Sequence, residues 1–258
     1  MPDTLGSDAR FFAHAGHAGV AGSAPPEGCP RVQRPTHHAP AGHPIPLASH
    51  LRYDQLLDYI AQRPSGGILE IGVARAANTL RMLAFADWLG GRPRYTGIDL
   101  FGLLTDDLFD HSFCSASKRP LSLEQTRLAL RRMLGDPIAS RIALFEGFSH
   151  EVLTRLIDQG QTYHLIFIDG GHSVDDVGRD WQLSQKLLER GGVIVFDDYP
   201  NWGVRPTVES IDQKAWSVRV LPHRDTFKNH RLDEDPTLFR HHQLVEVRRR
   251  DECENART

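Results

Sequence analysis

The fold is decided by the stretch GILEIGVARAANT, which runs from Gly67 to Thr79. It begins with a short apolar strand, residues 68–71, that is interrupted only by Glu70. A turn containing Gly72 follows, and a helix begins after the turn. In an open α/β sheet, such a strand–turn–helix unit presents backbone N–H groups and a carboxylate to a nucleotide-like ligand. We therefore expect this turn to form one half of a ligand site.

Apolar strands and amphipathic helices alternate five times after this unit begins. Strands that are apolar on both faces are typical of a parallel sheet covered by helices. The sequence therefore predicts a single α/β domain over residues 49–258, with a doubly wound, Rossmann-like, mostly parallel seven-stranded sheet and helices on both faces. The predicted strands are residues 68–71, 95–100, 141–145, 163–168, 193–196, 217–221 and 243–247.

Residues 1–48 have a different composition from the rest of the chain. They contain eight of the sixteen prolines, together with many Gly, Ala and His residues, and they show no helical or strand period. Such a segment buries too little apolar surface to offset its chain entropy. We expect a disordered tail that ends just before a helix capped by Ser49.

The composition excludes several classes of function. The net charge of −3 gives no electrostatic basis for binding nucleic acid or a membrane surface. Three widely spaced cysteines indicate neither a disulfide framework nor a zinc cluster. No apolar run approaches the length of a membrane span, and no secretory signal is evident. A cytoplasmic location is the expectation, and homo-oligomerisation is left open.

The pattern Glu70-x-Gly72-x-x-x-Ala76-x-Asn78-Thr79 resembles motif I of the class I S-adenosylmethionine-dependent methyltransferases. The resemblance implies that Glu70, Gly72, Asn78 and Thr79 hold the methionine end of S-adenosylmethionine, with the acid near its amino group. Ala76 stands where the family usually has a second glycine. A nicotinamide site would instead need the glycine-rich G-x-G-x-x-G turn, which is missing.

Two later strand ends extend the predicted cofactor site. Asp99 closes the second strand, where a carboxylate can accept hydrogen bonds from both ribose hydroxyls of a nucleoside. Gly147 and Ser149 follow the third strand, where the resembled family lines the adenine and methionine pocket. Ser149 can also be a helix N-cap, and both roles are compatible.

Carboxylates gather at the ends of the fourth and fifth strands. Asp169-Gly-Gly-His172 follows one strand, and Asp197-Asp198 follows the other. Neighbouring parallel strands are about 4.8 Å apart, so these side chains are expected to converge at one rim. Three carboxylates so close need a cation, and oxygen ligands favour Mg²⁺ or a similar divalent ion. We predict that Asp169, Asp197 and Asp198 bind this metal.

This arrangement resembles the metal-dependent O-methyltransferases that act on sugar hydroxyls of macrolides and related natural products. The resemblance covers roughly residues 65–200 and implies methyl transfer to a hydroxyl of a small molecule. Asp169 and His172 are the predicted catalytic residues, with His172 either a general base or a group beside the metal. The acceptor pocket is assigned to residues 101–120 and 222–242, with Trp202, His223 and His230 as candidates to line it.

Three alternatives remain open from the sequence. A catechol-type O-methyltransferase would share the metal chemistry but act on vicinal phenols. A nicotinamide-dependent oxidoreductase would have the same strand–helix–strand unit, but this sequence lacks the glycine-rich turn of that class. A non-catalytic S-adenosylmethionine-binding protein would bind the donor without turnover.

Overall fold

The computed structural model describes residues 51–108, 120–224 and 242–250. The predicted tail and its Ser49 cap lie outside the described residues. So do His230 and parts of both predicted acceptor loops, residues 109–119 and 225–241. Everything below refers to the described part of the chain.

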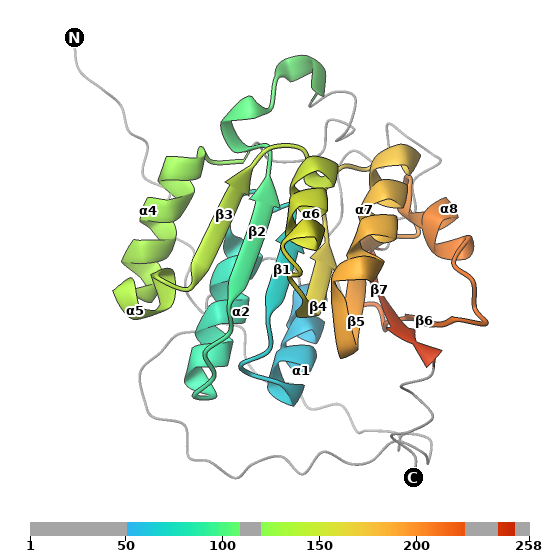
Figure 1. The fold of residues 1–258 in the computed structure, drawn as a ribbon, viewed down its shortest axis with the longest axis horizontal. Coiled ribbons are helices and arrows are strands. Elements are labelled where there is room, and N and C mark those ends of the chain that lie inside the picture. Colours follow the sequence, from blue (N-terminus) through green and yellow to red (C-terminus); the bar gives the residue numbers. More distant parts are fainter. Residues whose placement is uncertain (1–50, 109–119, 225–241, 251–258) are drawn as a thin grey trace, which may run out of the picture. The chain divides into compact units, whose positions relative to one another are not determined.

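A seven-stranded sheet runs through the centre of the fold in the order β3-β2-β1-β4-β5-β7-β6 (Figure 1). Strands β1 to β5 pair in parallel, whereas β7 pairs antiparallel with both β5 and β6. The predicted mostly parallel sheet is confirmed. The strands are β1 (Ile68–Ile71), β2 (Tyr95–Asp99), β3 (Ile142–Glu146), β4 (Tyr163–Ile168), β5 (Leu188–Tyr199), β6 (Trp216–Val220) and β7 (Gln243–Arg249).

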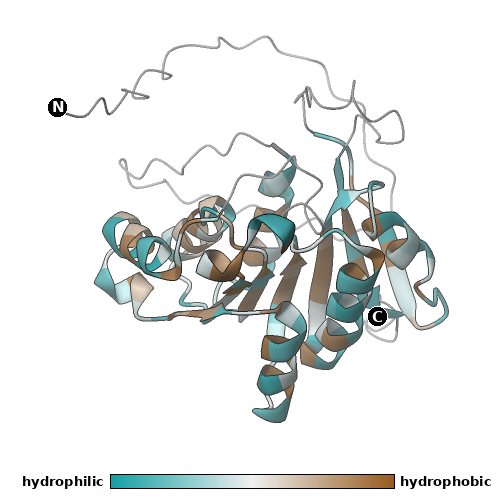
Figure 2. Ribbon diagram, turned by 90° about the horizontal axis from the view of Figure 1, so that it is seen from above, coloured by the Kyte–Doolittle hydropathy of each residue, from teal (hydrophilic) through white to brown (hydrophobic). Residues whose placement is uncertain are grey.

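Helices cover both faces of this sheet, and each face has its own hydrophobic core. One core contains residues of the first helices, such as Leu56 and Met82; the other contains residues of later helices, such as Val152 and Val177. Figure 2 shows the matching hydropathy, with apolar residues along the central strands and polar residues on the outer sides of the helices. The helices are η1 (Leu51–Tyr53), α1 (Asp54–Gln62), α2 (Ala77–Trp88), η2 (Phe101–Leu103), α4 (Leu123–Leu134), α5 (Asp136–Ala139), α6 (Ser149–Asp158), α7 (Val174–Leu187) and α8 (Val204–Glu209).

The strand order reverses direction at β1. From β1 the chain proceeds to β2 and β3 on one side, and then returns to β4 and β5 on the other. Ligands of open α/β sheets bind at such a switch point, beyond the carboxyl ends of the strands. The ends of β1 and β4 are therefore where the site is expected.

Local sequence signals account for most helix boundaries. The Ser122–Gln125 capping box opens α4, and the Ser173 hydroxyl caps α7 by accepting from the Asp176 N–H at 3.0 Å. Ser149 differs from its expected N-cap role, because Phe148 takes the cap position and Ser149 is the first residue of α6.

The short helix α8 begins at Val204 and ends at Glu209. Pro206 falls in its first turn, where the missing N–H has no helical partner and proline is tolerated. None of the described helices combines the length and apolar character that a membrane span requires.

Candidate active site

Gly72 brings the first turn against the end of β4. Its φ is +92°, and a Cβ at this position would lie 1.8 Å from the carbonyl oxygen of Asp169. Only glycine adopts this conformation without strain and leaves that space open. The predicted cofactor turn and the predicted metal residue Asp169 are thus adjacent through the backbone.

The rest of the turn takes a glycine-like conformation without glycine. Ala74 and Ala76 have φ values of +48° and +60°, in the left-handed region. The Ala76 N–H donates to the carbonyl of Val73 at 2.8 Å, which closes the turn just before α2. Ala76, which stands where the resembled family usually has a glycine, therefore adopts a left-handed conformation of the kind that glycine adopts readily.

Glu70 lies behind this turn, at 1 % exposure. Its Oε2 accepts hydrogen bonds from Tyr95 and from the Thr79 hydroxyl, the latter at 2.6 Å. Burial raises the pKa of Glu70 to about 7, although both hydrogen bonds act to lower it. The carboxylate thus joins β1 to α2 and β2. The structure places Glu70 and Thr79 together beneath the turn, whereas the resemblance placed them against the cofactor.

Two predicted cofactor residues lie nearer to the turn. Asn78 is half-buried, and its Oδ1 is buried without a hydrogen-bond partner among the described residues. Asp99 ends β2 and accepts from the Ala74 N–H at 2.8 Å and from the Phe101 N–H at 3.0 Å. Burial raises the pKa of Asp99, and these backbone hydrogen bonds oppose the rise. Asp99 therefore fixes the turn and the segment after β2.

The loop after β3 joins the same edge of the sheet. Gly147 donates its N–H to the Asp99 carbonyl at 3.0 Å and has a φ of +148°. Ser149 follows at the start of α6. All seven residues predicted to bind the cofactor therefore lie at or just behind the carboxyl ends of β1, β2 and β3.

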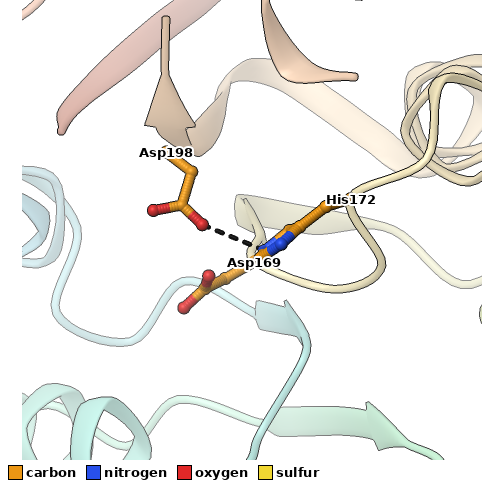
Figure 3. A group of neighbouring side chains, drawn as sticks. All are labelled: Asp169, His172 and Asp198. Carbon is orange, nitrogen blue, oxygen red and sulfur yellow. Dashed lines mark ion pairs between the residues drawn. The ribbon is translucent and has the colours of Figure 1, made fainter. Parts of the chain in front are cut away.

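Asp169, His172 and Asp198 meet at the ends of β4 and β5 (Figure 3). Their nearest ligand atoms all lie within 4.8 Å of one another, and His172 Nε2 is 3.0 Å from Asp198 Oδ2. The Asp169 carboxylate has no hydrogen-bond partner among the described residues. Its pKa is raised well above the ordinary value by burial and by the neighbouring Asp197 and Asp198 carboxylates. A cation at this point would relieve that repulsion.

Asp197 is not part of this group. Arg52 holds it in a two-point ion pair, with Nε–Oδ1 at 2.7 Å and Nη2–Oδ2 at 2.9 Å, and the Tyr53 hydroxyl donates to Oδ2 at 2.6 Å. Asp197 is only 1 % exposed. A guanidinium therefore neutralises the carboxylate that the sequence assigned to a metal ion.

His242 and Trp202 complete the surroundings of Asp198. His242 Nδ1 lies 2.7 Å from Asp198 Oδ1, and Trp202 stacks on His172 with ring centroids 4.4 Å apart. Burial would raise the pKa of Asp198, but the hydrogen bonds with both histidines hold it well below its ordinary value. The pKa of His242 is raised by Asp198, although burial opposes the rise.

Sequence reasoning missed Arg52, Tyr53 and His242 as site residues. Tyr53 contacts Phe167 in the core as well as Asp197. Arg52 and His242 are 145 and 44 positions from their partner aspartates. An arginine near a helix start and a histidine just before a predicted strand were the signals that the sequence offered.

Two hollows adjoin the group. A pocket of about 10 Å³, the size of a water site, is lined by Asp169, Asp197 and Asp198 together with the Gly170–His172 turn. A wider one of about 510 Å³ lies between Leu108, Phe148 and the start of α7. The site therefore has a narrow acidic part and a larger part beside the predicted cofactor loop.

Solved structures share this fold. The cofactor-bound protein Rv0187 from MTB aligns over 79 % of this chain and 82 % of its own, with a TM-score of 0.54 and 17 % identity. An O-methyltransferase from Bacillus cereus, in complex with SAH, aligns over 81 % and 83 %, with a TM-score of 0.52 and 15 % identity. At these identities the likeness shows the fold alone, a Rossmann-like α/β fold.

The family is shown by the sequence itself. Residues 69–199, just over half of the chain, match a family model described as a methyltransferase domain. This protein belongs to that family. A curated relative, "Probable caffeoyl-CoA O-methyltransferase 2" of Dictyostelium discoideum, is 31 % identical over 121 residues, which are 42 % of this chain and 50 % of the relative. The chain spans half or less of the length of the curated relatives it matches.

Proposed function

We propose that this protein is an S-adenosylmethionine-dependent O-methyltransferase that methylates a hydroxyl of a small molecule with the help of a divalent metal. The observation that carries the proposal is the Asp169–His172–Asp198 group, which adjoins the methyl-donor turn through the Gly72–Asp169 contact. The hollow beside Phe148, of about 510 Å³, is in the size range of ligand pockets and offers room for the donor.

The geometry of the group fits a metal ion. His172 Nε2 and Asp198 Oδ2 lie 3.0 Å apart, and the nearest ligand atom of Asp169 lies within 4.8 Å of both. One imidazole and two carboxylates form a mixed donor set, which moves the preference from Mg²⁺ toward a first-row transition metal. The residues that would hold the ion are Asp169, His172 and Asp198.

Of the two roles open to His172, the geometry favours the ligand over the general base. Its Nε2 faces Asp198, and its Nδ1 is buried on the opposite side of the ring. Trp202 covers one face of the ring and fixes its plane.

The chain's own residues then have distinct tasks in the transfer. The first turn and Asp99 fix the position of the donor, and orientation supplies much of the rate. When bound, the metal lowers the proton affinity of the acceptor hydroxyl. The bond between sulfur and the methyl carbon breaks as the bond from that carbon to the acceptor oxygen forms, and the thioether S-adenosylhomocysteine leaves. Asp169 is the predicted catalytic carboxylate of this group and, besides holding the ion, would take the hydroxyl proton on a carboxylate oxygen.

The acceptor has two candidate classes. The strand-end carboxylates resemble those of enzymes that methylate sugar hydroxyls, which supports a sugar or a glycosylated natural product. The 31 % identical relative carries the name of a caffeoyl-CoA O-methyltransferase, which supports a phenol instead. A screen of sugars against vicinal phenols, using methyl-labelled S-adenosylmethionine, separates these two.

The metal part of the proposal is tested with the full chain, chelator and added Mn²⁺ or Mg²⁺. Asp169→Asn and Asp198→Asn should each lower turnover by at least about 100-fold, because each removes a ligand. Asp158→Asn, at the exposed end of α6, is the matched control and should leave turnover unchanged. Full activity of both variants in chelator would refute metal assistance. Donor binding without transfer to any acceptor would favour the non-catalytic alternative.

A further inference from the structure

Asp180 is a buried acid with no evident structural purpose. It lies on α7 at 1 % exposure, and neither of its carboxylate oxygens has a hydrogen bond of good geometry among the described residues. Asp176, one turn earlier on the same helix, differs because its Oδ2 accepts from the Ser173 hydroxyl at 2.7 Å. An unpaired buried carboxyl costs folding free energy, and an apolar side chain would avoid that cost.

The position of Asp180 relates it to the active site. A Cβ on Gly170 would lie 3.5 Å from Asp180 Oδ2, so the carboxyl is packed directly against the turn that joins Asp169 to His172. A Cβ on Gly171 would lie 2.8 Å from Asp176 Oδ2, so the start of α7 and this turn are in close contact. Two glycines in succession permit this approach.

Asp180 also faces the donor side of the site. The Ser149 hydroxyl, at the start of α6, is close enough to lower the pKa of Asp180. Burial is the larger influence and raises that pKa to about 7, with Asp176 adding to the rise. The carboxyl therefore lies between the loop after β3, assigned to the cofactor, and the loop after β4, assigned to the metal and acceptor.

We propose that Asp180 is a positioning residue, which holds the Gly170–Gly171 turn, and through it Asp169 and His172, in place relative to the donor-side loop at Ser149. The inference rests on the proposed function of that site. A positioning role explains why the chain has a buried acid that lowers stability, since functional sites commonly contain residues that are unfavourable for stability.

The test compares Asp180→Asn and Asp180→Val with Ser184→Ala. Ser184 is the matched control, because it is buried on the same helix face one turn later and its hydroxyl also has no partner among the described residues. Both Asp180 variants should keep or raise the Tm yet lower kcat by about 10- to 100-fold, the usual effect of losing a group that orients ligands. Ser184→Ala should leave kcat unchanged.

Amide hydrogen exchange of residues 169–173 is measured on the same three variants and needs no activity. Exchange should accelerate in the Asp180 variants and stay at the wild-type rate in Ser184→Ala. Wild-type kcat with wild-type exchange in Asp180→Asn would overturn the inference, as would a parallel loss of Tm and kcat. If the wild type transfers no methyl group, the proposed function fails, and the exchange data alone decide whether Asp180 orders the turn.

Discussion

Arg52 and Asp197 form a two-point ion pair inside the site, although 145 positions separate them in the sequence. The arginine side chain is 7 % exposed and the aspartate side chain 1 %. The guanidinium neutralises the Asp197 carboxylate at two points. Our proposal therefore assigns the metal to Asp169 and Asp198, together with His172. Asp197 and Asp198 are neighbours in the chain and share Arg52, whose Nη2 lies 3.5 Å from Asp198 Oδ1, but only Asp198 also contacts His172 and His242.

Asp197→Asn should therefore affect stability more than metal binding. Removing the Asp197 charge leaves the buried Arg52 guanidinium with only its longer contact to Asp198, at 3.5 Å, which costs up to about 3–5 kcal/mol in free energy of unfolding. Urea denaturation measures this loss. Glu209→Gln, which breaks the exposed Arg205–Glu209 pair, is the control and should cost less than about 1 kcal/mol.

The double variant Arg52→Met with Asp197→Asn sharpens this prediction. It removes both charges, so it should recover most of the stability that Asp197→Asn loses. Loss of metal affinity in Asp197→Asn without loss of stability would contradict our assignment and return Asp197 to the metal ligands.

Glu70 should make stability depend on pH. Its pKa is raised from an ordinary value of 4.5 to about 7, mainly by burial, so the folded state holds its proton more tightly than the unfolded state does. The protonated carboxyl favours folding fully below pH 4.5, and that contribution is lost as the pH rises toward about 7. A shift of this size corresponds to a loss on the order of 3 kcal/mol.

The measurement is the difference in free energy of unfolding between wild type and Glu70→Gln at pH 5 and at pH 8. Relative to wild type, the variant should gain stability at pH 8, because glutamine is neutral at both pH values. Subtracting the two proteins cancels Asp180, which titrates in the same range. A difference that does not change with pH would mean that Glu70 has an ordinary pKa.

Ala74→Gly should be neutral or stabilising, by up to about 1 kcal/mol. The residue is exposed with a φ of +48°, so the substitution relieves a left-handed alanine while adding freedom to the unfolded chain. The same change at Ala84, inside α2, should destabilise by about 1 kcal/mol. Thermal unfolding of both variants measures the contrast, and a clear loss of stability in Ala74→Gly would show that the turn depends on the alanine side chain.

The sequence by itself determined the sheet and its two layers. Strands β1 and β4 were predicted to the residue, because each is a short, mostly apolar run of the kind that is buried in a parallel sheet. The caps of α4 and α7 are also local, since Ser122 and Ser173 each accept from an N–H three positions later. The family match over residues 69–199 agrees with the motif from which the methyl donor was inferred.

Only the tertiary structure decided which groups meet at the strand ends. Asp198 has a φ of +58°, and this local turn directs its carboxylate toward His172 and His242 while Asp197 faces Arg52. No periodic pattern encodes such a turn. Arg52 reaches the site from η1 and His242 from just before β7, so their partners are fixed by the closing of the whole sheet. The sequence supplies the carboxylates. The fold places Asp197 against the Arg52 guanidinium and Asp198 beside Asp169 and His172, in the group that we propose binds a metal.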